Sequence, residues 1–170
     1  MFYVTGLPRT GTTWFSNLLT ARKSFCFHEP LVNYSSKDFE QYLWMKTKDY
    51  NHVGISDSSL CTYYKKYVKP DEPMLILKRD PNEVIKSLNR QFGFDTSLMM
   101  DKMIEMLDGI EHNNVMYFNH EDLNDSEKIW KACDFLLEGS WMDKTRIKFL
   151  IETNVQRNED YIETLRHMRK

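Results

Sequence analysis

The chain lacks the features that mark membrane-spanning, secreted and disordered proteins. Its longest uninterrupted apolar runs, such as residues 74–77, have four residues, which is too short for a transmembrane helix. Residues 1–5 are typical of a strand and leave no room for the charged and apolar regions of a signal peptide, so we expect none. Hydrophobic residues make up 41% of the chain and charged residues 28%, a composition typical of a folded domain.

The chain also has no excess of either charge and few cysteines. Its 23 Lys and Arg residues against 25 Asp and Glu residues give a net charge of −2, so no overall attraction to nucleic acid or anionic membrane is expected. Cys26, Cys61 and Cys133 are odd in number and widely spaced, and they form no CxxC or His/Cys cluster that would indicate zinc. We expect reduced, buried thiols in a cytoplasmic protein. A length of 170 residues, without linker or repeat, predicts a single domain over residues 1–170.

Short β-prone segments alternate with segments of helical periodicity. We expect strands over residues 1–5, 25–28, 52–56, 73–78 and 115–118, the last two as buried strands. We expect helices over residues 12–22, 36–48 (with Ser36 as N-cap), 58–68, 81–92, 97–110, 126–138, 142–153 and 158–168. This alternation predicts an α/β fold of three α/β/α layers, with a central parallel sheet as in P-loop nucleotide-binding proteins.

The turn between the first strand and the first helix has the residues of an anion-binding loop. Residues 6–13 read GLPRTGTT, with a glycine at each end of the turn. The glycines let the backbone curl so that several N–H groups face one anion, and the helix N-terminus adds a partial positive charge. A nucleotide triphosphatase would have Lys at position 12, but this chain has Thr12, and its cation is Arg9 in the middle of the loop.

Residues 8–14, PRTGTTW, resemble the 5′-phosphosulfate loop of the sulfotransferases that use 3′-phosphoadenosine-5′-phosphosulfate (PAPS). The resemblance implies that Arg9 contacts the 5′-phosphate and the bridging oxygen. It also implies that the phosphate oxygens are held by loop amides and hydroxyls, which belong to Thr10, Gly11, Thr12 and Thr13. Trp14 would approach the adenine in this family, although a tryptophan here is equally typical of a core position.

Residues 79–87, RDPNEVIKS, resemble the 3′-phosphate motif of the same family, in which an Arg ends a strand and a Ser follows in the next helix. The resemblance implies that Arg79 and Ser87 bind the 3′-phosphate. An Arg at the carboxyl end of a parallel strand also lies where ligands of open α/β sheets bind. The alternative is an Arg in a surface ion pair and a solvated Ser.

A third, weaker match covers residues 115–123 and the helix after them. His120 stands where many family members have a Tyr whose ring lies near the adenine. His120 either takes that place or is an ordinary loop histidine. The C-terminal residues lack the Arg-Lys-Gly segment that closes over the nucleotide in cytosolic members, and Arg157 is a candidate replacement.

Sulfuryl transfer needs a base that takes the proton of the acceptor hydroxyl, and three residues are candidates. Glu29 is favoured, because some carbohydrate and tyrosylprotein sulfotransferases that this chain resembles carry a catalytic Glu at a similar distance from the loop. His28 has a suitable ordinary pKa, near ~6.5. Asp57 lies in the segment where cytosolic members place a catalytic His. The alternative for Glu29 is a loop carboxylate that only binds backbone N–H groups or a nearby Arg.

The sequence therefore predicts an enzyme that moves a sulfuryl group from PAPS to an acceptor hydroxyl, with adenosine 3′,5′-bisphosphate (PAP) as product and no metal. The acceptor is a sugar, a phenol or an exposed side chain. Two alternatives remain: a P-loop kinase or other NTP-dependent phosphotransferase, and a non-catalytic nucleotide-binding module. Thr12 argues against the kinase, because its side chain has no charge to place on the β- and γ-phosphates.

Overall fold

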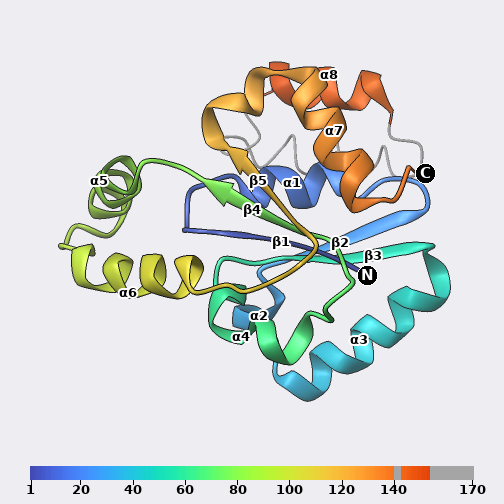
Figure 1. Ribbon diagram of the computed structural model, residues 1–170, viewed down its shortest axis with the longest axis horizontal. Helices are drawn as coiled ribbons and strands as arrows, with labels where there is room; N and C mark the ends of the chain where they lie inside the picture. Colours follow the sequence, from blue (N-terminus) through green and yellow to red (C-terminus); the bar gives the residue numbers. More distant parts are fainter. Residues whose placement is uncertain (140–142, 154–170) are drawn as a thin grey trace.

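The computed structural model describes residues 1–139 and 143–153, which form an α/β fold around a parallel sheet (Figure 1). The five strands are β1 (Phe2–Gly6), β2 (Ser24–His28), β3 (His52–Ser56), β4 (Met74–Lys78) and β5 (Val115–Asn119). Their order is β2-β3-β1-β4-β5, and every neighbouring pair is parallel. The predicted fold class is confirmed.

Helices cover both faces of the sheet (Figure 1). One face carries α1 (Thr12–Leu19), α7 (Ser126–Leu136) and α8 (Lys144–Glu152). The other carries α3 (Ser36–Asp49), α4 (Leu60–Tyr67) and α6 (Ser97–Asp108). The remaining helices are α2 (Pro30–Asn33), α5 (Pro81–Phe92) and the 3₁₀ helix η1 (His120–Asn124).

Each face has its own hydrophobic core. Phe15 and Leu18 of α1 pack with Ile129 of α7 and Leu150 of α8 on one side of the sheet, and all four are buried. On the other side, buried residues of α3 and α4 pack against β1 and β3; they include Phe39, Leu60, Tyr3 and Ile55. The central strands β1 and β4 are buried on both faces, which explains their continuous apolar sequences.

Several predicted boundaries are wrong for local reasons. The helix predicted over residues 12–22 ends at Leu19, because Thr20 leaves the helical conformation (φ −92°, ψ 88°) and Ala21 pairs with Ser24 in an antiparallel bridge. The N-cap of α3 is Ser35, not Ser36, and its side chain accepts from the amide of Asp38.

Other differences concern whole elements. The strand predicted as buried over residues 115–118 lies at the sheet edge, and Tyr117 is 55% exposed. The short helices α2 and η1 were not predicted from the sequence. The helix predicted over residues 158–168 and the candidate Arg157 lie outside the described residues.

The strand order places two loops at one point. The chain runs from β1 to β2 and β3 on one side and later returns to β4 on the other side of β1. The loops after β1 and β4 therefore meet at the carboxyl ends of adjacent parallel strands, where such folds bind ligands. Gly6 allows this close approach, because a Cβ atom on Gly6 would lie 2.6 Å from the carbonyl oxygen of Leu77.

Two further predictions concern membrane-spanning helices and the three cysteines. Among the helices of residues 1–139 and 143–153, none has the length and apolar character that crossing a membrane requires. Cys26, Cys61 and Cys133 are free thiols, and each is buried as predicted.

Candidate active site

The loop after β1 presents the N-terminus of α1. Gly11 is the N-cap and has φ of 116°, a conformation that favours glycine. No side chain of the described residues caps this end of α1, and the amides of a first helical turn have no partner within the helix. The backbone of the loop therefore offers N–H groups and a partial positive charge to an anion.

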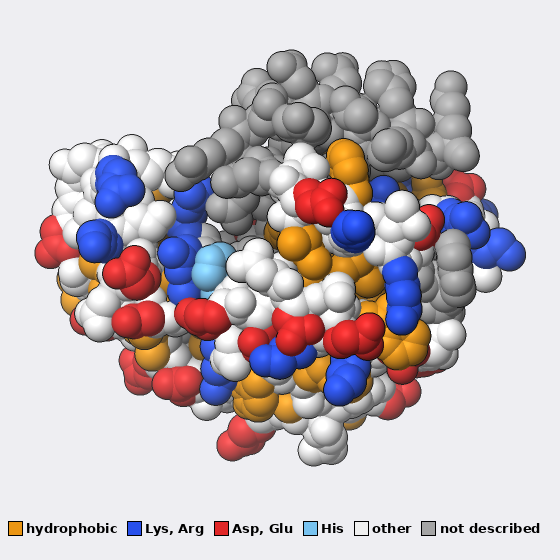
Figure 2. Space-filling model, turned by 90° about the horizontal axis from the view of Figure 1, so that it is seen from above, with side chains coloured by type: hydrophobic (Ala, Val, Ile, Leu, Met, Phe, Trp, Pro, Cys, Tyr) orange, Lys and Arg blue, Asp and Glu red, His pale blue; other side chains and the backbone are white. Residues whose placement is uncertain are grey.

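Arg9 connects this loop to the segment after β4. Its Nε atom donates to Ser87 Oγ at 3.3 Å, and its own carbonyl accepts a hydrogen bond from Arg79 Nη1 at 2.8 Å. Arg9 is exposed and has φ of 69°, in a region that non-glycine residues rarely adopt. The structure thus brings together Arg9, Arg79 and Ser87, which come from the two predicted phosphate-binding motifs. A row of Lys and Arg side chains beside a histidine is visible from above (Figure 2).

Thr10 and His120 shape the loop from behind. Thr10 is 1% exposed, and both its hydroxyl (2.7 Å) and its amide (3.3 Å) donate to the carbonyl of Leu7. These two donors of Thr10 therefore hold the turn together. His120 Nδ1 lies 3.1 Å from the Thr10 carbonyl oxygen, which can only accept, so Nδ1 carries the proton. His120 lies against the predicted phosphate loop, and its adenine contact stays a prediction.

Trp14 lies in the hydrophobic core. Its side chain is 6% exposed, and its ring packs edge-on against Phe15 with the ring centroids 5.2 Å apart. The indole Nε1 donates to the carbonyl of Leu150 in α8 at 3.2 Å. Of the two alternatives that the sequence left open, this position corresponds to the core residue and gives no support to the adenine contact.

Glu29 lies beside the first residue of α1. Its Oε1 atom accepts from Thr12 Oγ1 at 3.2 Å, and its Oε2 atom accepts from the amide and the hydroxyl of Ser58, both at 3.1 Å. Burial, together with the nearby Asp57 carboxylate, raises the pKa of Glu29 to about 7. A partly buried carboxylate with a pKa near neutrality has the property that a general base requires. Glu29 also has φ of 47°, in the left-handed region.

The other two candidate bases have different surroundings. His28 Nε2 lies 2.9 Å from Thr13 Oγ1, and burial lowers the pKa of His28 below its usual 6.5. Asp57 is 0% exposed and accepts three hydrogen bonds, from the amide of Leu31 (2.8 Å) and from the amide (2.8 Å) and hydroxyl (2.6 Å) of Ser59. The Asp57 carboxylate is therefore inaccessible to an acceptor. Its negative charge affects the site by raising the pKa of Glu29.

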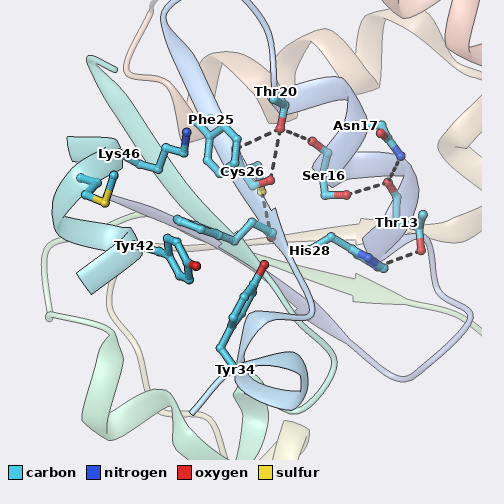
Figure 3. A pocket seen from close by; sticks show the side chains of 12 residues that line it. Thr13, Ser16, Asn17, Thr20, Phe25, Cys26, His28, Tyr34, Tyr42 and Lys46 are labelled. Atoms are coloured by element: carbon cyan, nitrogen blue, oxygen red, sulfur yellow. Dashed lines mark hydrogen bonds between the residues drawn. The ribbon is translucent and has the colours of Figure 1, made fainter. Parts of the chain in front are cut away.

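A pocket of about 600 Å³ lies next to these residues, along the edge strand β2 and between α1 and α3 (Figure 3). Thr13 and His28 belong to its lining and also to the end of the loop described above. Sequence reasoning missed the pocket, because it depends on how α3 packs beside β2. One signal in the sequence is a Tyr and a Lys four residues apart on α3, at positions 42 and 46.

No protein-family model matches the chain, and no curated protein matches it. Residues 1–139 and 143–153 contain no group of three or more His, Cys, Asp or Glu side chains that could hold a metal ion.

Proposed function

We propose that the protein transfers a sulfuryl group from PAPS to an acceptor hydroxyl. The observation that carries the proposal is the meeting of Arg9, Arg79 and Ser87 beside the open N-terminus of α1. PAPS has anionic groups at both ends of its ribose, so it suits a site with two groups of anion-binding residues. The 5′-phosphosulfate would lie on the loop after β1, and the 3′-phosphate would lie near Arg79 and Ser87.

In the proposed reaction, the acceptor oxygen attacks the sulfur as the bond from sulfur to the bridging oxygen breaks. The electron pair of that bond passes to the bridging oxygen, which leaves as part of PAP. Arg9 stabilises the negative charge that develops there, and Glu29 takes the proton of the acceptor hydroxyl. Thr12 connects the anion-binding loop with Glu29. It is the first residue of α1, and its hydroxyl donates to Glu29 Oε1 at 3.2 Å.

The same contacts weigh against the two alternatives. A kinase would need a cation at position 12, whereas the Thr12 hydroxyl is neutral and is already bonded to Glu29. A non-catalytic module would not need a carboxylate with a pKa near 7 beside its anion loop. The three free, buried thiols suit a reducing compartment such as the cytoplasm, which we include in the proposal.

A thermal-shift comparison tests the proposal. Saturating PAP is expected to raise the Tm by several degrees, while ATP with Mg²⁺ at the same concentration has a smaller effect. A ligand that binds only the folded state stabilises it by about 2.7 kcal/mol at one hundred times its Kd, enough for a shift of this size. Stabilisation by ATP with Mg²⁺ and none by PAP would contradict the proposal and favour the phosphotransferase.

Replacing Arg79 with Ala is expected to weaken PAP binding about 10-fold or more, and to weaken binding of adenosine 5′-phosphate less. The loss is smaller for adenosine 5′-phosphate because it has no 3′-phosphate, and some loss is still expected because Arg79 also holds the loop through the Arg9 carbonyl. Calorimetric titration of both nucleotides measures the difference. Lys86→Ala is the matched control, since Lys86 precedes Ser87 but is paired with Glu83 at 3.8 Å. Equal losses for the two nucleotides would show that Arg79 does not bind the 3′-phosphate.

A further inference from the structure

The pocket beside β2 has one wall whose polar groups are already bonded. On α1, Ser16 Oγ and Asn17 Nδ2 both donate to the carbonyl of Thr13, at 2.9 and 3.0 Å. The hydroxyl of Thr20 donates to the carbonyl of Ser16 at 2.8 Å. This wall therefore offers a ligand fewer hydrogen-bond donors than its residue types suggest. A sugar with many hydroxyl groups would find few free donors on this wall.

The opposite wall is aromatic. The rings of Phe25 and Phe27 pack edge-on with their centroids 4.8 Å apart. The rings of Tyr34 and Tyr42 are 5.4 Å apart, and each residue is 45% exposed. Figure 3 shows the hydroxyl groups of both tyrosines directed into the same space beside β2. Such a wall suits a flat aromatic ring, which can pack against it edge-on or offset.

Lys46 supplies a cation at one end of this pocket. Its ammonium group lies 4.9 Å from the centroid of the Phe25 ring. Within residues 1–139 and 143–153, Lys46 forms no salt bridge with a carboxylate. The backbones of Phe25 and His28 are three residues apart on β2, or about 10 Å at the usual rise of a strand, and their side chains lie on opposite faces of the sheet. The pocket thus follows the sheet edge from Lys46 and Phe25 on the α3 side to Thr13 and His28 on the α1 side, where His28 lies 3.9 Å from Glu29.

The edge of β2 is closed to an extended peptide. The bridge between Ala21 and Ser24 uses the outward backbone groups of Ser24. The amide of Cys26 donates to the hydroxyl of Thr20 at 3.0 Å, and this hydroxyl also lies against the Cys26 carbonyl, at 3.1 Å. A peptide that joined the sheet as an additional strand would need these backbone groups. The pocket therefore fits a small molecule better than a peptide in strand conformation.

We infer, on the basis of the proposed function, that this pocket is the acceptor site and that the acceptor is a hydroxyaryl acid. The ring lies between the aromatic wall and α1, and the anionic group lies beside Lys46. The hydroxyl lies at the end formed by His28 and Thr13, next to Glu29.

Calorimetric titration of the full chain, with and without PAP, tests this inference. The probe is 3-(4-hydroxyphenyl)propanoate, whose hydroxyl and carboxylate lie at opposite ends, and it is compared with its neutral amide and with glucuronate. We expect the acid to bind about 10-fold more tightly than the amide, and glucuronate to bind more weakly than either. Lys46→Met is expected to remove the preference for the acid over the amide. Lys48→Met should keep it, because Lys48 lies over Trp44 on the same helix.

The outcomes separate this inference from the proposed function. If Lys46→Met binds the acid as tightly as the unchanged protein does, or if glucuronate binds best, the inference is wrong. If PAP binds and the hydroxyaryl acid does not, the inference fails while the donor assignment stands. If the acid binds in a manner that depends on Lys46 and PAP does not bind, the chemistry of the pocket is supported and the sulfotransferase proposal fails.

Discussion

Replacing Glu29 with Gln is expected to lower the rate of sulfuryl transfer by about 10²–10⁴-fold and to leave PAP affinity nearly unchanged. Glutamine has almost the same shape and can still accept from the Ser58 amide, which lies 3.1 Å from Glu29 Oε2. It cannot take a proton from the acceptor. Single-turnover rates at saturating acceptor, together with the Kd of PAP, measure the two quantities separately.

The pH dependence provides the control for this assignment. A base works only when it is deprotonated, so the rate should rise with pH and reach half its maximum near pH 7, the pKa to which burial and Asp57 raise Glu29. Asp57→Asn removes the neighbouring charge and should move this midpoint to lower pH. His28 is the base if Glu29→Gln keeps near-full turnover with a pH midpoint below 6.5, and if His28→Asn loses turnover.

Much of the framework could be predicted, because it depends on local signals. Continuous apolar residues in β4 and the alternation of strand-like with helix-like segments indicate a parallel sheet before any contact is known. The meeting of Arg9 with Arg79 and Ser87 was expected from the resemblance of their two motifs to one nucleotide site, and the structure explains it, since both loops leave the carboxyl ends of the adjacent strands β1 and β4. The strand order could not be read from the sequence, and so the exposed edge position of β5 was missed.

The chemical surroundings of the site could not be predicted, because they depend on tertiary packing. Nothing around residue 57 indicates that Asp57 is fully buried and that its charge acts on Glu29. Trp14 has the same neighbours in the sequence whether it faces a nucleotide or the core, and only the packing of α8 decides between them. The pocket beside β2 likewise exists only because α3 packs beside an edge strand.

Replacing Arg9 with Ala is expected to affect both chemistry and donor binding. Turnover should fall by about 10²–10³-fold, the usual effect of removing a group that stabilises charge in the transition state. PAP affinity should fall about 10-fold, because the proposed role of Arg9 includes binding of the 5′-phosphate in the ground state. In this respect Arg9→Ala differs from Glu29→Gln, which should change turnover alone. Steady-state kcat and the calorimetric Kd of PAP, measured on the same preparation, give both values.

The backbone of Arg9 allows a sharper control. Arg9 has φ of 69°, so an alanine there keeps the strained conformation, whereas a glycine adopts it without strain. If the losses came from a distorted loop, Arg9→Gly would recover them. If they come from the missing guanidinium group, as we expect, Arg9→Gly is as inactive as Arg9→Ala and at least as stable to heat. Recovery of turnover by Arg9→Gly would show that Arg9 only shapes the loop, and the charge stabilisation would then belong to Arg79 or to the amides of α1.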